Sequence, residues 1–137
     1  MADAVTTQWV YPPNWQGETE PGWRRMIVHL TNISDGAGET AVVKVNKGEL
    51  RTKQGREPSK LVVEKIVPQI SGMAVTLAFD RVPVETIAVL NDASGCMEFD
   101  GGLVDPGEGG TGDIILTTTG HSSGDSYDII LHIRLKD

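Results

Sequence analysis

The chain has 137 residues, of which 39% are hydrophobic and 16 are glycine, a size and composition that favour one domain of short strands joined by tight turns over a helical bundle. Its net charge is −7, from 19 acidic and 12 basic residues, which argues against general nucleic-acid binding because phosphate contacts need clustered Lys and Arg. The single cysteine, Cys96, excludes an intrachain disulfide and a cysteine-only metal site.

Residues 1–22 lack a clear hydrophobic period, yet four of the chain's seven aromatic residues fall in the first 23 positions. The pair Pro12-Pro13 enforces an extended backbone. We therefore predict an extended N-terminal arm over 1–22 and a β-domain over 23–137. The arm either covers the domain's own core or binds a partner, because large aromatic side chains dominate many contacts. The candidate partner-binding residues are Trp9, Tyr11, Pro12, Pro13, Trp15 and Trp23.

Strand signals begin at residue 24 and recur to the end of the chain. The last segment is the clearest, because every second residue from Tyr127 to Leu135 is apolar. The segment 61–67 is ambiguous, since Pro58 is able to open a helix, but its Val and Ile content favours a strand. About seven or eight short strands predict an all-β fold, an antiparallel β-sandwich or jelly roll. The predicted strands are 24–32, 40–45, 61–67, 73–79, 86–90, 96–99, 113–119 and 127–135.

The glycine-rich run 107–112 is the segment closest to a nucleotide-binding loop. A strand rather than a helix follows it, and acidic residues there would repel phosphate. We interpret it as a mobile loop or one that packs its backbone close to a neighbour. Asp105, Glu108 and Asp113 offer oxygen ligands for calcium, but their spacing matches no calcium-binding loop. We predict no cofactor and no metal, and leave calcium at this loop open.

The histidines also lack the spacing of a metal site. His29, His121 and His132 form neither a His-x-His nor a His-x-x-x-His pair. His29 and His132 fall on the polar faces of two predicted strands, where we expect surface residues with hydrogen-bond partners. Cys96 lies in a short apolar stretch, and we expect it to be buried or half-buried.

The segment 120–124, Gly-His-Ser-Ser-Gly, fits the pattern of a nucleophilic serine at Ser122. That pattern acts in a strained turn between a strand and a helix, whereas a strand follows here. Asp125 or Asp128 and then His132 come in the order of a catalytic triad, but order alone does not bring them together. We interpret the segment as a hairpin turn and predict that the protein is not an enzyme and has no catalytic residue.

The first four residues have neither the basic region nor the apolar run of a signal peptide. No stretch approaches the about 18–20 apolar residues of a membrane span. We therefore expect a protein made and kept in a cytoplasm, or in a particle assembled there, without membrane contact.

Several segments together resemble small structural proteins of tailed bacteriophage heads, the decoration or cement proteins of the capsid. The resemblance runs from about Met26 to the end of the chain and consists of turns and strands, so it transfers no catalytic or binding residue. It implies β-sandwich or jelly-roll subunits in small oligomers, a trimer being favoured, that clamp neighbouring major capsid proteins on the virion surface. The segments are 30–36 (LTNISDG), 62–66 (VVEKI), 101–106 (GGLVDP), 111–118 (TGDIILTT) and 127–135 (YDIILHIRL).

The leading hypothesis is therefore a capsid decoration protein. The alternative is a binding module, either of a phage tail or fibre or for carbohydrate, because sandwich folds carry many functions. An exposed groove lined by Trp9, Trp15 or Trp23 would favour sugar stacking, whereas burial of these residues at a subunit contact would favour assembly.

Overall fold

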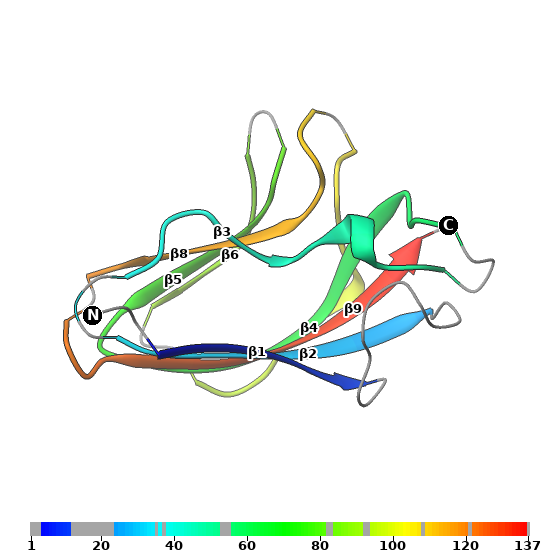
Figure 1. Ribbon diagram of the computed structural model, residues 1–137. Helices are drawn as coiled ribbons and strands as arrows, with labels where there is room; N and C mark the ends of the chain where they lie inside the picture. The colour runs from blue at the N-terminus through cyan, green and yellow to red at the C-terminus, as the bar shows by residue number, and fades with distance from the viewer. Residues whose placement is uncertain are drawn as a thin grey trace.

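Nine strands form two antiparallel sheets in the described part of the computed structural model (Figure 1). The five-stranded sheet has the order β1 (Ala4–Tyr11), β2 (Arg25–Ile33), β9 (Ser126–Lys136), β4 (Lys60–Ser71) and β7 (Met97–Val104). The four-stranded sheet has the order β3 (Val42–Val45), β8 (Ile114–Thr119), β5 (Ala74–Phe79) and β6 (Glu85–Asn91). One short 3-10 turn, η1 (Lys47–Glu49), follows β3. The structure describes residues 4–11, 24–34, 36, 38–52, 56–81, 84–91, 94–107, 109–120 and 122–136, with the backbone alone for 4–6, 11 and 100.

The strand pairing makes this sandwich a jelly roll. β2 pairs with β9, β3 with β8, β4 with β7 and β5 with β6, so the strands pair from the outermost inward, as in one long hairpin. The chain changes sheet at every connection from β2 to β9 except the one between β5 and β6. A long hairpin wrapped in this way around a single core is jelly-roll topology. The predicted all-β sandwich or jelly roll is confirmed, as is the strand at 61–67.

The core lies between the two sheets and follows the alternation of the sequence. In β9 the residues Tyr127, Ile129, Leu131, Ile133 and Leu135 are each at most 6% exposed. They pack against buried residues of β2, β4, β5 and β8 in one cluster. Because successive side chains of a strand face opposite sides, the residues between them reach the outer face of the five-stranded sheet.

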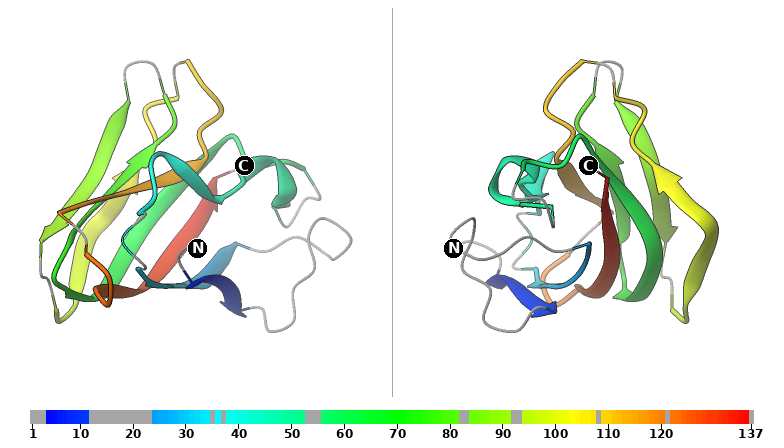
Figure 2. Two further views of the ribbon diagram at one scale, coloured as in Figure 1. Left: turned by 60° about the vertical axis from the view of Figure 1, so that its left-hand side comes forward. Right: turned by 90° about the vertical axis from the view of Figure 1, so that its right-hand side faces the viewer.

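Residues 4–11 of the predicted arm form β1, an edge strand next to β2 (Figure 2). Trp9 lies opposite the fully buried Val28 and packs, half-buried, against the common core. This part of the N-terminal segment therefore belongs to the sheet. Residues 12–23 lie outside the described residues, so the boundary between arm and domain stays a prediction.

Two buried polar clusters tie the sheets together. In the first, Glu39 accepts hydrogen bonds from Lys44 Nζ of β3 at 2.5 Å and from Tyr127 Oη of β9 at 2.6 Å. The amide of Asn32, in β2, donates to the same carboxylate at 2.8 Å. These donors come from both sheets, so the cluster joins them at one end of the sandwich.

The second cluster joins the loop after β5 to the loop after β7. Arg81 donates from Nε and Nη2 to the two carboxylate oxygens of Asp105, at 2.7 and 2.5 Å. Its third nitrogen, Nη1, donates to the carbonyl of Gly109 at 2.7 Å. Asp105 is fully buried and Arg81 is 8% exposed. The glycine-rich segment is thus packed against a buried ion pair, which agrees with the second of the two interpretations of this loop.

Candidate functional site

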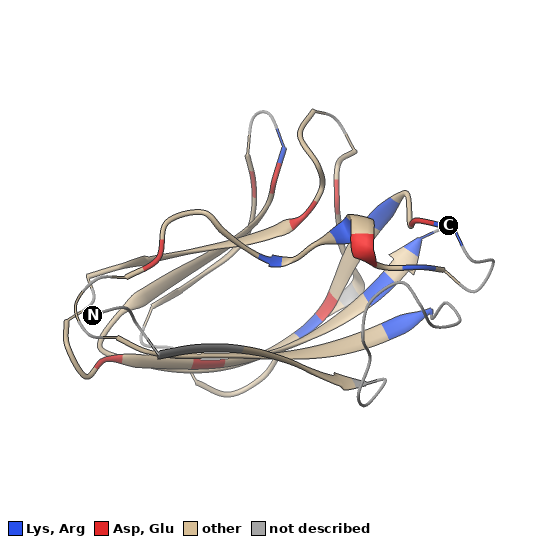
Figure 3. Ribbon diagram, in the orientation of Figure 1, with Lys and Arg blue, Asp and Glu red and all other residues tan. Residues whose placement is uncertain are grey.

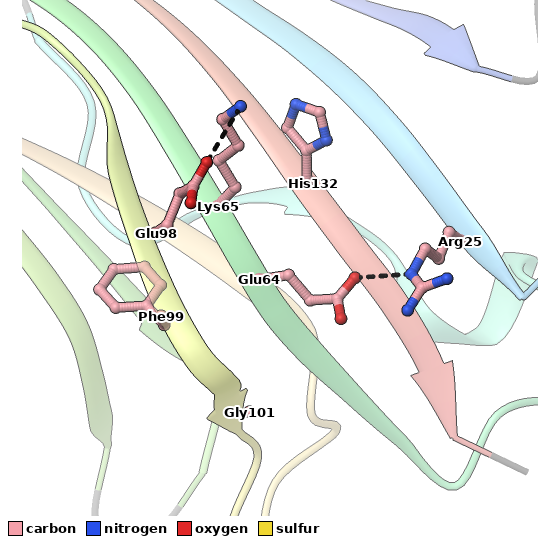
Figure 4. A pocket seen from close by; sticks show the side chains of 7 residues that line it. All are labelled: Arg25, Glu64, Lys65, Glu98, Phe99, Gly101 and His132. Carbon is pink, nitrogen blue, oxygen red and sulfur yellow. Dashed lines mark hydrogen bonds and ion pairs between the residues drawn. The ribbon is translucent and has the colours of Figure 1, made fainter.

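A hollow of about 610 Å³ lies on the outer face of the five-stranded sheet (Figure 4). Four neighbouring strands, β2, β9, β4 and β7, contribute its walls. The mixture of charged, aromatic and imidazole groups suits a polar ligand. The side chains that line it are Arg25, Glu64, Lys65, Glu98, Phe99 and His132.

The hollow exists because two neighbouring strands depart from regular pairing at the same place. In β4 the register shifts at Glu64, both against β9 and against β7. Consecutive residues normally face opposite sides of a sheet, but after this shift Glu64 and Lys65 both line the hollow. Across the same step the partners in β7 jump from Glu98 to Leu103. Residues 99–102 therefore leave the ladder, and their excursion leaves the space.

Gly102 holds this excursion against β4. Its φ is +83°, and a Cβ atom there would overlap Cγ1 of Val62. Gly101 has nearly the same φ, +80°, but a Cβ atom on it would meet nothing within 4 Å.

We expect Gly101→Ala to lower the free energy of unfolding by about 1 kcal/mol through backbone strain. Gly102→Ala should lower it by about 2–3 kcal/mol, because the overlap of its Cβ atom with Val62 adds to the same strain. Urea unfolding measures both, and equal losses would contradict the close packing on Val62.

The charges of the hollow form two linked groups. Glu64 is shared by two guanidinium groups, with Arg25 Nε at 2.9 Å and Arg134 Nε at 3.2 Å from its two oxygens. Lys65 Nζ lies 3.5 Å from Glu98 Oε1. Among the side chains that the structure describes, three cations and two carboxylates meet here, so their summed charge is positive in a chain of net charge −7.

His132 lies on β9 between these groups. Burial lowers the pKa of its imidazole, and the nearby Lys65 lowers it further, while Glu64 and Glu98 only partly offset these effects. The ring is therefore neutral at pH 7, and the positive charge of the hollow comes from Arg and Lys alone.

The outer face of the four-stranded sheet is a second, contrasting surface. In β5 and β8 the chain neighbours of Thr76, Ala78 and Ile115 belong to the core, so alternation directs these three residues to the other side, although Ala78 and Ile115 are only 3% and 8% exposed. Val43 is 47% exposed and Val89 is 64% exposed. In Figure 3 the charged positions of β8, β5 and β6 lie at or beyond the strand ends, and the Lys44 side chain of β3 is buried. We call this surface the uncharged face; its rows are Val43, Ile115, Ala78 and Thr86, and Thr117, Thr76 and Val89.

The predicted partner-binding residues are placed only in part. Trp9 packs against the chain's own core, which favours self-packing over recognition at this position. For Tyr11 the structure gives the backbone in β1 alone. Pro12, Pro13, Trp15 and Trp23 lie outside the described residues, so their role stays a prediction.

The residues considered for chemistry lie apart or serve the fold. Ser122 is exposed, and its backbone N–H donates to Asp125 Oδ2 at 2.7 Å. The turn at 120–124 is as predicted, but β8 and β9 lie in different sheets, so it is a connection between sheets rather than a hairpin. His29 Nε2 lies 2.7 Å from Asp128 Oδ1, as expected for a surface histidine with a partner. His121 lies outside the described residues.

Two expectations about single residues need comment. Cys96 is exposed, so the expectation of a buried or half-buried thiol was wrong; it precedes the first residue of β7 and takes no part in the core. Of the three candidate calcium ligands, Asp105 is held by Arg81, and Asp113 Oδ1 accepts the Lys47 N–H at 2.8 Å. Glu108 lies outside the described residues.

Comparisons with known proteins identify no relative: no family model, curated protein or solved structure matches the chain. Among the residues that the structure describes, no three His, Cys, Asp or Glu side chains gather as a metal site would require. No helix in the described ranges has the length and apolar character to cross a membrane. The observations that bear on function are therefore the fold, the hollow and the uncharged face.

Proposed function

We propose that this protein is a viral structural protein, a decoration (cement) protein that binds the outside of a tailed-phage head as a small homo-oligomer. There it stabilises contacts between major capsid subunits. The resemblance of its strand and turn segments to such proteins supports the proposal. So does the jelly roll, which recurs in viral capsid proteins as well as in lectins and cupins. Because one fold carries many functions, the argument depends on the surfaces.

The observation that carries the proposal is the uncharged face. The centres of protein interfaces are depleted in charged residues, and here Thr, Val, Ile and Ala lie in register across four strands, with Val43, Thr86 and Val89 as the exposed members. Exposed β-branched side chains on a sheet offer a stiff surface to a rigid partner. On a capsid lattice many copies bind together, so modest contacts of this kind suffice to hold the shell.

A charge placed on this face should weaken binding to the capsid. We expect Val89→Glu to weaken binding to phage heads lacking the protein by about 2–4 kcal/mol, because a carboxylate would be buried without a partner. Co-sedimentation with the heads measures binding. Release of DNA on heating should follow it, with wild-type protein protecting the heads and the variant failing to do so.

Ile33→Glu is the matched control. Ile33 is 60% exposed, close to the 64% of Val89, but it lies on β2 in the other sheet. Its variant should bind like the wild type. Equal binding by the Val89 variant, or equal DNA release from heads with and without wild-type protein, would count against the proposal.

No described observation favours the alternative of a carbohydrate-binding or tail module over this one. Sugar stacking needs an exposed aromatic platform, and Trp9 instead packs against the core. Phe99 lines the hollow but is also packed against the core cluster.

A further inference from the structure

The Arg25–Glu64–Arg134 cluster is an unbalanced set of charges. One carboxylate holds two guanidinium groups, and each uses its Nε for that contact. Arg134 also donates from Nη2 to the carbonyl of Gly101 at 3.3 Å. In Figure 4 Arg25 contacts Glu64 through Nε, and one of its two Nη nitrogens points away from that carboxylate. The Glu64 carboxylate thus fixes the orientation of both guanidinium groups through Nε. Their remaining Nη N–H groups can donate hydrogen bonds to a further acceptor.

The surroundings concentrate positive charge at the same end of the sheet. Arg25 lies opposite Arg134, and Lys60 lies opposite Lys136, in adjoining pairs of strands. Figure 3 shows these positions together where β2 and β4 begin and β9 ends. An approaching anion is therefore attracted to this end, although the whole chain is acidic.

Beside the charged hollow lies a smaller, more apolar groove of about 280 Å³. The hollow and the groove share three lining residues, Arg25, Glu64 and His132. Ile27 on β2 lines the groove but not the hollow. A ligand that reaches Arg25 with an anionic group can therefore lay a short aliphatic stem along Ile27. An acidic side chain, a carboxylate on a methylene stem, has this form.

We propose that the hollow on the outer face of the five-stranded sheet binds a carboxylate side chain, Asp or Glu, from a partner protein. The partner's carboxylate would be the second in the cluster, so that two guanidinium groups face two carboxylates and their charges balance. A guanidinium group also matches the geometry of a carboxylate, because it can donate two parallel hydrogen bonds to its two oxygens. A doubly charged phosphate suits the site less well, because Glu64 and Glu98 lie in its wall. The inference rests on the proposed function only in taking the ligand to be a protein.

The test is a titration of the full chain with hexaglutamate at pH 7 and low ionic strength, followed by the NMR signals of the arginine Nε–H groups. We expect the signals of Arg25 and Arg134 to shift. Arg25→Gln should weaken binding about tenfold or more, since charge-assisted hydrogen bonds are lost. The Arg25 side chain is 62% exposed, so this variant should keep the fold.

Arg24→Gln is the control, because it removes the same charge from the neighbouring exposed residue. It should change the affinity less than twofold. Equal weakening by both variants would overturn the proposal, since the attraction would then be a general effect of charge. The absence of any shift in the Nε–H signals of Arg25 and Arg134 would also overturn it. Binding of hexagalacturonate without binding of hexaglutamate would overturn the assignment to a protein. This titration uses no phage heads, and the Val89→Glu variant that tests the proposed function changes the other sheet. The two experiments can therefore fail independently.

Discussion

Replacing Arg81 by Met should lower the free energy of unfolding by about 3–5 kcal/mol, the cost of leaving a buried charge without its partner. Asp105 is fully buried and receives both of its side-chain ion-pair contacts from Arg81. Among the described residues, the backbone N–H of Gly107 would be the remaining hydrogen-bond donor to it, at 3.0 Å. Urea unfolding followed by tryptophan fluorescence measures the loss, and the midpoint should fall with little change in slope.

Two further variants decide whether the loss comes from the ion pair. Arg24→Met removes an exposed arginine and should change stability by less than about 0.5 kcal/mol. The double variant Arg81→Met with Asp105→Leu should recover much of the loss, because an apolar pair of similar volume replaces both charges. If the double variant is as unstable as Arg81→Met alone, the loss reflects packing of the loop and not the orphaned carboxylate.

The same pair predicts how this loss depends on pH. Burial alone would raise the pKa of Asp105, but hydrogen bonds from Arg81 and from the Gly107 N–H outweigh burial and hold it below its usual value. The wild-type pair therefore stabilises the fold fully above about pH 4, the ordinary carboxylate range, and loses this contribution as the pH falls through the lowered pKa. In Arg81→Met the carboxyl group is protonated more easily. The difference between variant and wild type should thus shrink between about pH 5 and about pH 3.

Replacing Lys44 by Met should cost about 3 kcal/mol, at the lower end of the range for a broken buried ion pair. Lys44 is 8% exposed and its Nζ lies 2.5 Å from Glu39 Oε2. The loss is smaller than at Arg81 because Asn32 and Tyr127 continue to donate to the carboxylate. Thermal unfolding by circular dichroism is the measurement, with Lys136→Met as the control for an exposed lysine.

Adding Glu39→Gln to the Lys44 variant provides the decisive comparison. A neutral amide oxygen still accepts a hydrogen bond from Tyr127, and no charge remains buried. We expect the double variant to be more stable than Lys44→Met. A further loss of stability would show that the carboxylate contributes through its hydrogen bonds from Asn32 and Tyr127 more than through Lys44.

The strands could be predicted from the sequence because their signal is local. The period of two from Tyr127 to Leu135 appears unchanged as the burial pattern of β9. Glycine turns marked most of the boundaries, and the jelly roll was one of two topologies compatible with the strand count. The strand β1 was not predicted as such, because prolines and aromatic residues suggested an arm, while pairing with β2 depends on partners about 20 residues away.

The hollow could not be predicted, because it depends on irregular pairing. Alternation placed Arg25, His132 and Arg134 on polar faces, and that much was visible in the sequence. Nothing local indicated that β4 shifts its register at Glu64. The buried pair of Arg81 and Asp105 was missed for the same reason: they lie on different loops, and Asp105 was considered only as a calcium ligand.

The pairing order of the jelly roll also dictates when the domain is able to fold on a ribosome. β9 lies between β2 and β4, near the middle of the five-stranded sheet, yet it is the last strand along the chain. β2 pairs with β1 on one side, but its partner on the other side lies about 100 residues downstream, and contacts this distant in sequence slow folding. During that time the edges of β2 and β4 stay open to pairing with other chains. Nascent chains held before β9 emerges should thus be sensitive to protease and prone to aggregation, and the Arg25–Glu64–Arg134 cluster forms only after β9 is in place.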